Sequence, residues 1–179
     1  MKIIIILSFI LVLSSETKCQ ELLNTQESYI IKYVTGQNGK LILKRYTHDI
    51  ATNTHGDVLI FGFPTPEVEK SGLFQATFFF SPEGNCIHYL YRYSNYKSLL
   101  FIVNNLDNPN SGLIRKKNTA LWTSQNDART TITVKKDAAF AQPPNFEVNY
   151  MQRPVNYVPY KTELDDDIQK MFPGIKKQE

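Results

Sequence analysis

Residues 48–57 bring together two imidazoles and two carboxylates, the side chains best suited to metal binding or general acid–base catalysis. They are His48, Asp49, His55 and Asp57. Histidine and carboxylate ligands suit divalent metal ions, and a histidine near a carboxylate can move protons. The spacing matches no familiar ligand set, however, and the intervening Asn, Thr and Gly residues are typical of a polar loop. We therefore predict a solvated loop with no metal, and keep a hydrolase site at His48 and Asp57 as an alternative.

Cys86 and His88 form the second candidate pair. Residues two apart share one face of a strand, so the thiol and the imidazole could lie close together. Thiol catalysis also needs an exposed sulfur of low pKa and a third group that orients the base. No nearby residue is marked for that third role, which favours a buried core cysteine. We accordingly predict that the protein is not an enzyme and carries no cofactor, with a Cys86/His88 hydrolase as the alternative.

The N-terminus reads as a secretory signal peptide. Lys2 precedes an apolar run from Ile3 to Leu13, and a short polar segment follows up to Cys19. The run is shorter than the ~20 apolar residues that span a bilayer. We predict a signal peptide over residues 1–19, cleavage before Gln20, and a secreted protein without a membrane anchor. A cut after Ser14 would instead leave Cys19 able to pair with Cys86.

Composition narrows the class of protein further. The chain has 179 residues, with 20 Lys and Arg against 17 Asp and Glu. This length suits one domain, and the small net charge does not indicate a nucleic-acid partner. Two cysteines are too few for a disulfide-rich scaffold or a zinc finger.

Nine short runs of β-branched and aromatic residues predict strands between turn-forming residues. They cover residues 29–34, 41–46, 58–63, 73–80, 87–93, 99–103, 120–123, 130–134 and 146–150. Short, evenly spaced runs without a helical period are typical of all-β domains. We predict an antiparallel β-sandwich or barrel of about nine strands over residues 20–151.

The aromatic hairpin of residues 73–93 is the densest feature of the sequence. Its loop, residues 81–85, fits a type I turn with Gly84 in the left-handed conformation. If Ser81 pairs with Asn85, then Phe79 faces Ile87 in the following strand. Both faces of this hairpin are aromatic, which predicts a central hairpin covered on both sides.

The same aromatic residues support an alternative, a ligand cavity inside a barrel. The candidates for lining it are Phe79, Tyr89 and Tyr91. The ligand would be a small apolar molecule.

The last 28 residues, 152–179, differ in character from the β-domain. Pro154 and Pro159 predict an extended strap without sheet pairing. A short amphipathic helix follows, capped by Thr162 and stopped by Pro173. Its apolar stripe consists of Leu164, Ile168 and Phe172. We expect this stripe either to dock on the sheet or to meet a partner.

Part of the chain resembles a family of small secreted insect proteins, those grouped with multiprotein bridging factor two. The segment Asn145–Tyr150 is similar to the closing strand of that family, and Phe78–Tyr96 is similar to its middle. The resemblance covers about residues 74–150. It implies a small secreted β-protein with no catalytic residues.

These observations predict a secreted, non-enzymatic β-domain that binds an extracellular protein or a surface. A barrel that carries a small apolar ligand is the first alternative, and a hydrolase is the second. The partner is not identified by the sequence.

Overall fold

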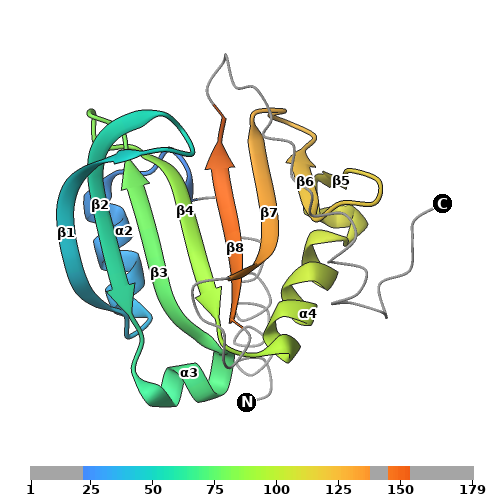
Figure 1. Cartoon of the computed structure of the whole chain (residues 1–179), viewed down its shortest axis with the longest axis horizontal. Coiled ribbons are helices and arrows are strands. Elements are labelled where there is room, and N and C mark those ends of the chain that lie inside the picture. The colour runs from blue at the N-terminus through green and yellow to red at the C-terminus, as the bar shows by residue number, and fades with distance from the viewer. Residues whose placement is uncertain (1–21, 138–144, 154–179) are drawn as a thin grey trace, which may run out of the picture.

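The computed structural model describes residues 22–137 and 145–153. Within them, three α-helices, one short 3-10 helix and eight strands follow one another along the chain (Figure 1). The elements are α2 (Glu27–Gly36), β1 (Lys40–Asp49), β2 (Thr54–Gly62), α3 (Thr65–Ser71), β3 (Leu73–Phe80), β4 (Cys86–Tyr93), α4 (Tyr96–Leu106), η2 (Pro109–Ser111), β5 (Leu113–Arg115), β6 (Leu121–Ser124), β7 (Thr130–Asp137) and β8 (Asn145–Gln152).

The eight strands form one antiparallel sheet in the order β1-β2-β3-β4-β8-β7-β6-β5. Each half of the sheet repeats one arrangement, a helix followed by four strands that pair in sequence, and the halves meet where β4 pairs with β8. The predicted antiparallel β-structure is thus confirmed, but the domain is mostly rather than entirely β, because three α-helices accompany the sheet in the described part of the chain. A closed barrel or a two-sheet sandwich of nine strands is not what the described residues form, because β1 and β5 lie at opposite edges of a single open sheet.

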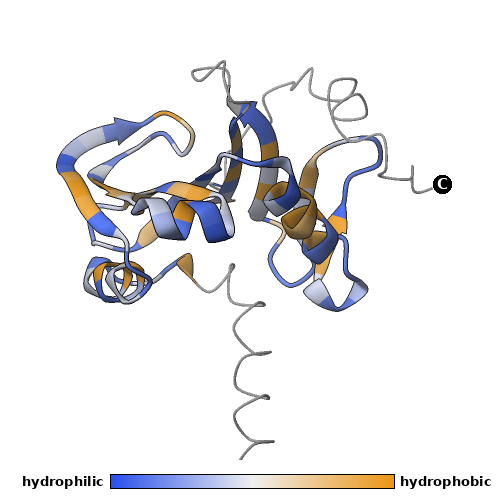
Figure 2. Cartoon of the chain, turned by 90° about the horizontal axis from the view of Figure 1, so that it is seen from below, coloured by the Kyte–Doolittle hydropathy of each residue, from blue (hydrophilic) through white to orange (hydrophobic). Residues whose placement is uncertain are grey.

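Helices α2 and α4 pack on the same face of this sheet (Figure 2). Ile30 and Val34 of α2 join one apolar core with Leu99 and Val103 of α4. The strands contribute large side chains to the same core, among them Phe61, Phe78, Tyr89, Trp122, Ile132 and Tyr150. The core therefore lies in one layer between sheet and helices.

Two predicted strands are helices, and the reason is visible in their burial. Residues 29–34 belong to α2 and residues 99–103 belong to α4. In α4 the buried Leu99, Val103 and Leu106 follow the helical spacing of four and three residues. The Asn95 side chain caps this helix by accepting a hydrogen bond from the Ser98 backbone N–H at 2.8 Å. β-branched residues in both runs favoured strands locally, but packing against the sheet selects the helix.

The β3–β4 hairpin has the predicted loop but a different register. The Ser81 N–H donates to the Asn85 carbonyl at 2.8 Å, and Gly84 has the left-handed φ of 81°. Beyond the loop, Phe79 pairs with His88 rather than with Ile87, because Ile87 is an extra residue that forms a β-bulge.

The bulge decides which side chains of β4 face the helices. A shift of one residue moves every following side chain to the other face of a strand. Tyr89 and Tyr91 consequently enter the core beneath the helices, whereas His88 lies on the opposite face.

Three predicted segments fall outside the described residues. They are the signal peptide, the proline-containing strap from Pro154 onward, and the C-terminal helix with Leu164, Ile168 and Phe172. The start of the predicted strap is wrong, because Gln152 ends β8 and pairs with Thr130. None of the helices within residues 22–137 and 145–153 has the length and apolar character that crossing a membrane requires.

The helical assignment of residues 96–106 predicts unequal effects of two neighbouring substitutions. Leu99 is fully buried and Phe101 is 53% exposed. We expect Leu99→Ala to lower the free energy of unfolding by about 2–5 kcal/mol, and Phe101→Ala by less than about 0.5 kcal/mol. Urea denaturation of the two variants measures both. In a strand the two residues would share a face, so similar losses would contradict the helix.

Candidate functional site

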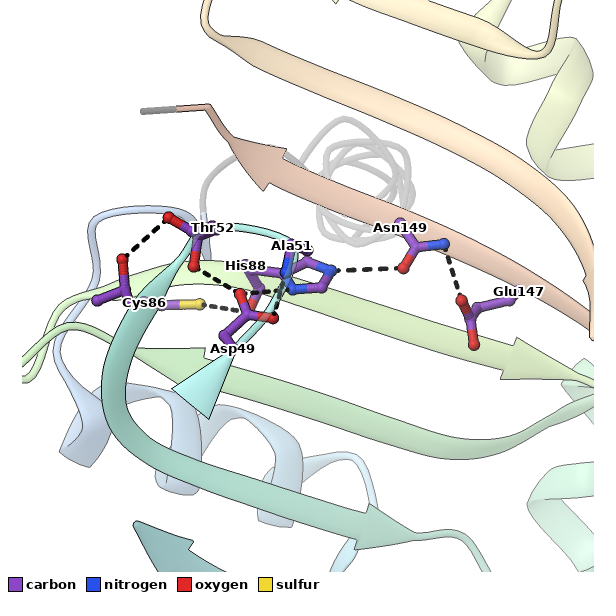
Figure 3. A network of polar contacts seen from close by, with 8 residues as sticks. Asp49, Ala51, Thr52, Cys86, His88, Glu147 and Asn149 are labelled. Carbon is purple, nitrogen blue, oxygen red and sulfur yellow. Dashed lines mark hydrogen bonds and ion pairs between the residues drawn. The ribbon is translucent and has the colours of Figure 1, made fainter. Parts of the chain in front are cut away.

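A polar network lies on the sheet face opposite the helices (Figure 3). It joins Asp49 at the end of β1 and Thr52 in the following turn to His88 in β4, and then to Asn149 and Glu147 in β8. All of these residues except Asn149 are less than a tenth exposed. Buried titratable groups in contact with one another mark candidate functional sites, which makes this network the first place to look for chemistry.

The local turn aims the Asp49 carboxylate at β4. Its Oδ1 accepts a hydrogen bond from the Ala51 N–H at 3.2 Å, and its Oδ2 accepts one from the Thr52 hydroxyl at 2.6 Å. Such bonds from an aspartate to the backbone two residues on are common in tight turns. In this position Oδ2 also lies 3.1 Å from Nδ1 of His88.

The contacts of Asp49 keep its carboxylate ionised. Burial on its own would raise the pKa of Asp49. The hydrogen bond and charge of His88, with smaller contributions from Thr52 and Ala51, outweigh burial and leave the pKa below its ordinary value of 3.8. The pair thus ties the β1–β2 hairpin to the centre of the sheet.

The other ring nitrogen of His88 meets β8. Nε2 lies 3.4 Å from Oδ1 of Asn149, while Nδ2 of that amide donates to Glu147 at 3.0 Å. Since the amide nitrogen is used by Glu147, its oxygen faces the ring as an acceptor. Both nitrogens of His88 therefore lie within hydrogen-bond distance of a side-chain oxygen.

Glu147 is the anionic end of the network. Lys135 of β7 lies 2.7 Å from its carboxylate, and the guanidinium of Arg92 lies 3.1 Å away. Burial would raise the pKa of Glu147, but Lys135, Asn149 and Arg92 together lower it. Arg92 also donates to Gln75 of β3 at 3.1 Å, so the network reaches strands on both sides of the β4–β8 pair.

This arrangement holds segments together and leaves His88 poorly placed for catalysis. Both ring nitrogens contact protein groups, and the ring of Phe79 stacks on the imidazole at 4.8 Å with an interplanar angle of 10°. The Thr52 hydroxyl of the same network donates to Asp49. The chemical task that the geometry supports is to anchor the end of β1.

The Cys86/His88 pair does not have the geometry of a thiol and its base. Cys86 is fully buried, and its thiol donates to the backbone oxygen of His88 at 3.7 Å rather than to the ring. Burial raises the pKa of Cys86 to about 12, so the thiolate is scarce at neutral pH. Asp49 does supply a group that orients His88, which sequence reasoning missed because the two lie 39 residues apart.

His48 and Asp57 are not brought together either. The ring of His48 stacks on that of His55 across the hairpin at 4.5 Å, while Asp57 lies 3.1 Å from Lys44. Residues 48–57 form two strand ends and a tight turn, so the prediction of a simple solvated loop is wrong for the buried Asp49. Among the described residues, no group of three or more His, Cys, Asp or Glu could hold a metal ion.

The aromatic ligand candidates divide between the two faces of the sheet. Tyr89 and Tyr91 are buried in the core, where Tyr89 stacks on Tyr150 at 4.5 Å. Phe79 lies on the opposite face against His88. The described structure therefore does not bring Phe79 together with the two tyrosines into one lining.

The outer edge of β1 is a second candidate site, and the sequence did not single it out. In the described part of the chain no strand pairs with this side of β1, which is ten residues long. Its exposed apolar side chains are Leu41 at 46%, Ile42 at 68%, Leu43 at 39% and Tyr46 at 66%. We call residues 40–49 with these side chains the β1 edge.

Comparison with known proteins does not place the chain in a family. No family model, no curated protein and no solved structure matches it.

Removal of the Asp49 charge should be costly at neutral pH. We expect Asp49→Asn to lower the free energy of unfolding by about 1–3 kcal/mol, because it removes the buried carboxylate that contacts Nδ1 of His88 and the Thr52 hydroxyl. The pKa of Asp49 is lowered in the folded state, so the carboxylate stabilises the protein above pH 3.8. This stabilisation is lost as the pH falls through the folded-state pKa. The difference in free energy of unfolding between wild type and variant should therefore become smaller in that pH range. Urea denaturation at several pH values measures it.

Asp57→Asn on the same hairpin is the matched control. Asp57 pairs with the exposed Lys44, so its loss should cost less than about 1 kcal/mol. Equal losses for the two variants would show that the buried contact between Asp49 and His88 does not stabilise the fold.

Cys86 should behave as a structural thiol. We expect alkylation of the native protein at pH 8 to be slow and to become fast only in denaturant, because burial excludes the reagent and disfavours the thiolate. Cys86→Ser should lower the free energy of unfolding by about 1–2 kcal/mol. Mass spectrometry follows the modification, and rapid labelling of the native protein would restore the thiol-hydrolase interpretation.

Proposed function

We propose that the protein is a secreted, non-enzymatic domain that binds an extracellular protein through the β1 edge. One observation carries this proposal. Leu41, Ile42 and Leu43 are consecutive apolar residues, and all three are exposed on a ten-residue edge strand. A run of this kind is unfavourable in water unless another molecule covers it.

The two edges of the sheet are treated differently. Edge strands expose unpaired backbone groups, and proteins usually shorten or cover them to prevent unwanted pairing. At the far edge, β5 has only three residues. β1 is long and apolar instead, which favours a surface kept for a partner.

Contacts between β1 and the rest of the domain keep this strand ordered. Asp49 fixes its C-terminal end to His88, and Lys44 near its middle pairs with Glu27 of α2 at 2.6 Å and with Asp57 of β2. A strand that is already ordered loses little conformational entropy when a partner binds. The edge is thus pre-organised.

Secretion and the lack of catalysis rest on separate features. The run Ile3–Leu13 supports secretion, and cleavage before Gln20 would leave the buried Leu22 and Leu23 in the mature chain. The engaged His88 ring and the buried Cys86 thiol favour a binding role over a hydrolytic one.

The test compares two pairs of exposed apolar residues. Ile42→Thr with Leu43→Thr keeps the preference for strand but removes the apolar surface of the β1 edge. Phe101→Thr with Ile114→Thr removes similar exposed surface elsewhere. Wild-type protein, recovered from the medium of secreting cells, is used to isolate its partner from extracellular fluid, and affinities are then measured.

We expect the β1 variant to bind the isolated partner at least about tenfold more weakly, a loss of about 1.4 kcal/mol. The control should bind like wild type. Undiminished binding by the β1 variant would contradict the assignment of this edge.

A further inference from the structure

We infer that the β1 edge recognises an extended acidic peptide segment, which adds a strand to the sheet beside β1. This inference rests on the proposed binding function and specifies the chemistry of the partner. It joins three observations, namely the outward-facing backbone of β1, the placement of its apolar side chains, and the sign of its charges.

The backbone of β1 supplies the main-chain bonds. From Leu43 to Asp49 the pairing with β2 is regular, without interruption. In such a ladder alternate residues turn their N–H and C=O groups away from the neighbouring strand. An extended peptide can pair with these groups, as in the known mode of strand addition to a sheet edge.

A bulge near the start of β1 gathers apolar side chains on one face. Leu41 pairs with Phe61 and Leu43 with Ile60, so Ile42 is an extra residue. Ile42 lies over Gly62, where an added Cβ would come within 2.6 Å of its Cδ1 atom. Gly62 pairs with Gln75, which contacts Arg92 on the face opposite the helices, so Ile42 lies on that face. Leu43 lies there too, because its partner Ile60 is two residues from Gly62 and shares its face.

Cations flank this apolar pair. Lys40 pairs with Gly62, and Arg45 pairs with Val58, which places both on the same face as Ile42 and Leu43. Both cations belong to exposed residues. A strand added beside β1 would therefore meet a positive charge on either side of an apolar centre, which complements carboxylates flanking an apolar residue.

The charge of β1 as a whole also favours an acidic partner. Asp49, the only acid in the strand, is buried against His88 and cannot offset the exposed cations. The cation Lys44 is already matched by Glu27 and Asp57. Pairing of two β1 strands from two copies of this chain would double the cations without adding an exposed carboxylate, so a second copy fits the edge less well.

The test uses three short peptides and the full mature protein. The first peptide has Asp, Val and Asp at alternate positions with Thr between them, so that in a strand the two carboxylates flank the apolar residue on one face. The second peptide has Lys in place of each Asp, and the third has Pro in place of the central Val. Fluorescence anisotropy measures their binding at low and at high salt. We expect the Asp peptide to bind at least about tenfold more tightly than the Lys peptide, and its affinity to fall with added salt.

The Pro peptide should bind at least about tenfold more weakly than the Asp peptide, because proline lacks the N–H that the added strand needs. Lys40→Gln with Arg45→Gln should lower the affinity of the protein for the Asp peptide about fivefold. Lys116→Gln with Lys117→Gln removes two exposed cations outside β1 and should leave its affinity unchanged.

Several results would overturn the inference. Equal binding of the Asp and Lys peptides would show that the charges of β1 do not select an acidic partner. Binding of the Pro peptide as tight as that of the Asp peptide would show that the peptide does not bind by adding a strand. Failure of all three peptides would exclude this mode of recognition. A dimer in sedimentation that Ile42→Thr with Leu43→Thr dissociates would make a second copy the occupant. If none of the peptides binds, but Ile42→Thr with Leu43→Thr still weakens binding of the isolated partner, the proposed function stands. Only the inferred chemistry of the partner is then wrong.

Discussion

The bulge at Ile87 is the constraint on which the rest of the structure depends. Without this extra residue, Tyr89 and Tyr91 would point away from the helices, and the imidazole of His88 would be forced into the apolar core. With it, Tyr89 stacks between Phe78 at 5.6 Å and Tyr150 at 4.5 Å, which fills the centre of the layer under the helices. Aromatic packing of this extent favours the bulged register. A buried imidazole among these rings would have no comparable set of acceptors.

The same register links the core to the β1 edge. His88 can bind Asp49 only because the bulge turns it to the face opposite the helices, and Asp49 is the last residue of β1. That contact holds the end of the edge strand over the centre of the sheet, while Lys44 holds its middle to α2 through Glu27. The protein thus uses buried charge to position a strand whose outer side is unpaired in the described structure. The surface proposed for binding is a consequence of the packing beneath it.

Much of the strand content could be predicted from the sequence, because the relevant signals are local. The run 73–80 coincides with β3, and the turn signal at Gly84 gave the correct loop. The sequence-based predictions are wrong where the local structure depends on contacts between residues far apart in the chain. Ile30 and Val34 have the spacing of a helix face, but β-branched residues favour strands locally, and only packing against the sheet selects the helix. No local sequence pattern predicts that Ile87 is an extra residue in β4. None predicts that Asp49 contacts a histidine of β4, or that β1 lies at the edge of the sheet. Those facts follow from strand order, which short-range patterns do not encode.

The contacts between aromatic side chains across β3 and β4 report the register directly. In a nuclear Overhauser spectrum of the labelled protein, we predict cross-peaks between the rings of Phe79 and His88 and between those of Phe78 and Tyr89, as the ring distances of 4.8 Å and 5.6 Å require. An unbulged hairpin would instead place Phe79 beside Ile87 and Phe78 beside His88. Cross-peaks for these alternative pairs, with none between Phe79 and His88, would contradict the bulge and with it the link from the core through Asp49 to the β1 edge.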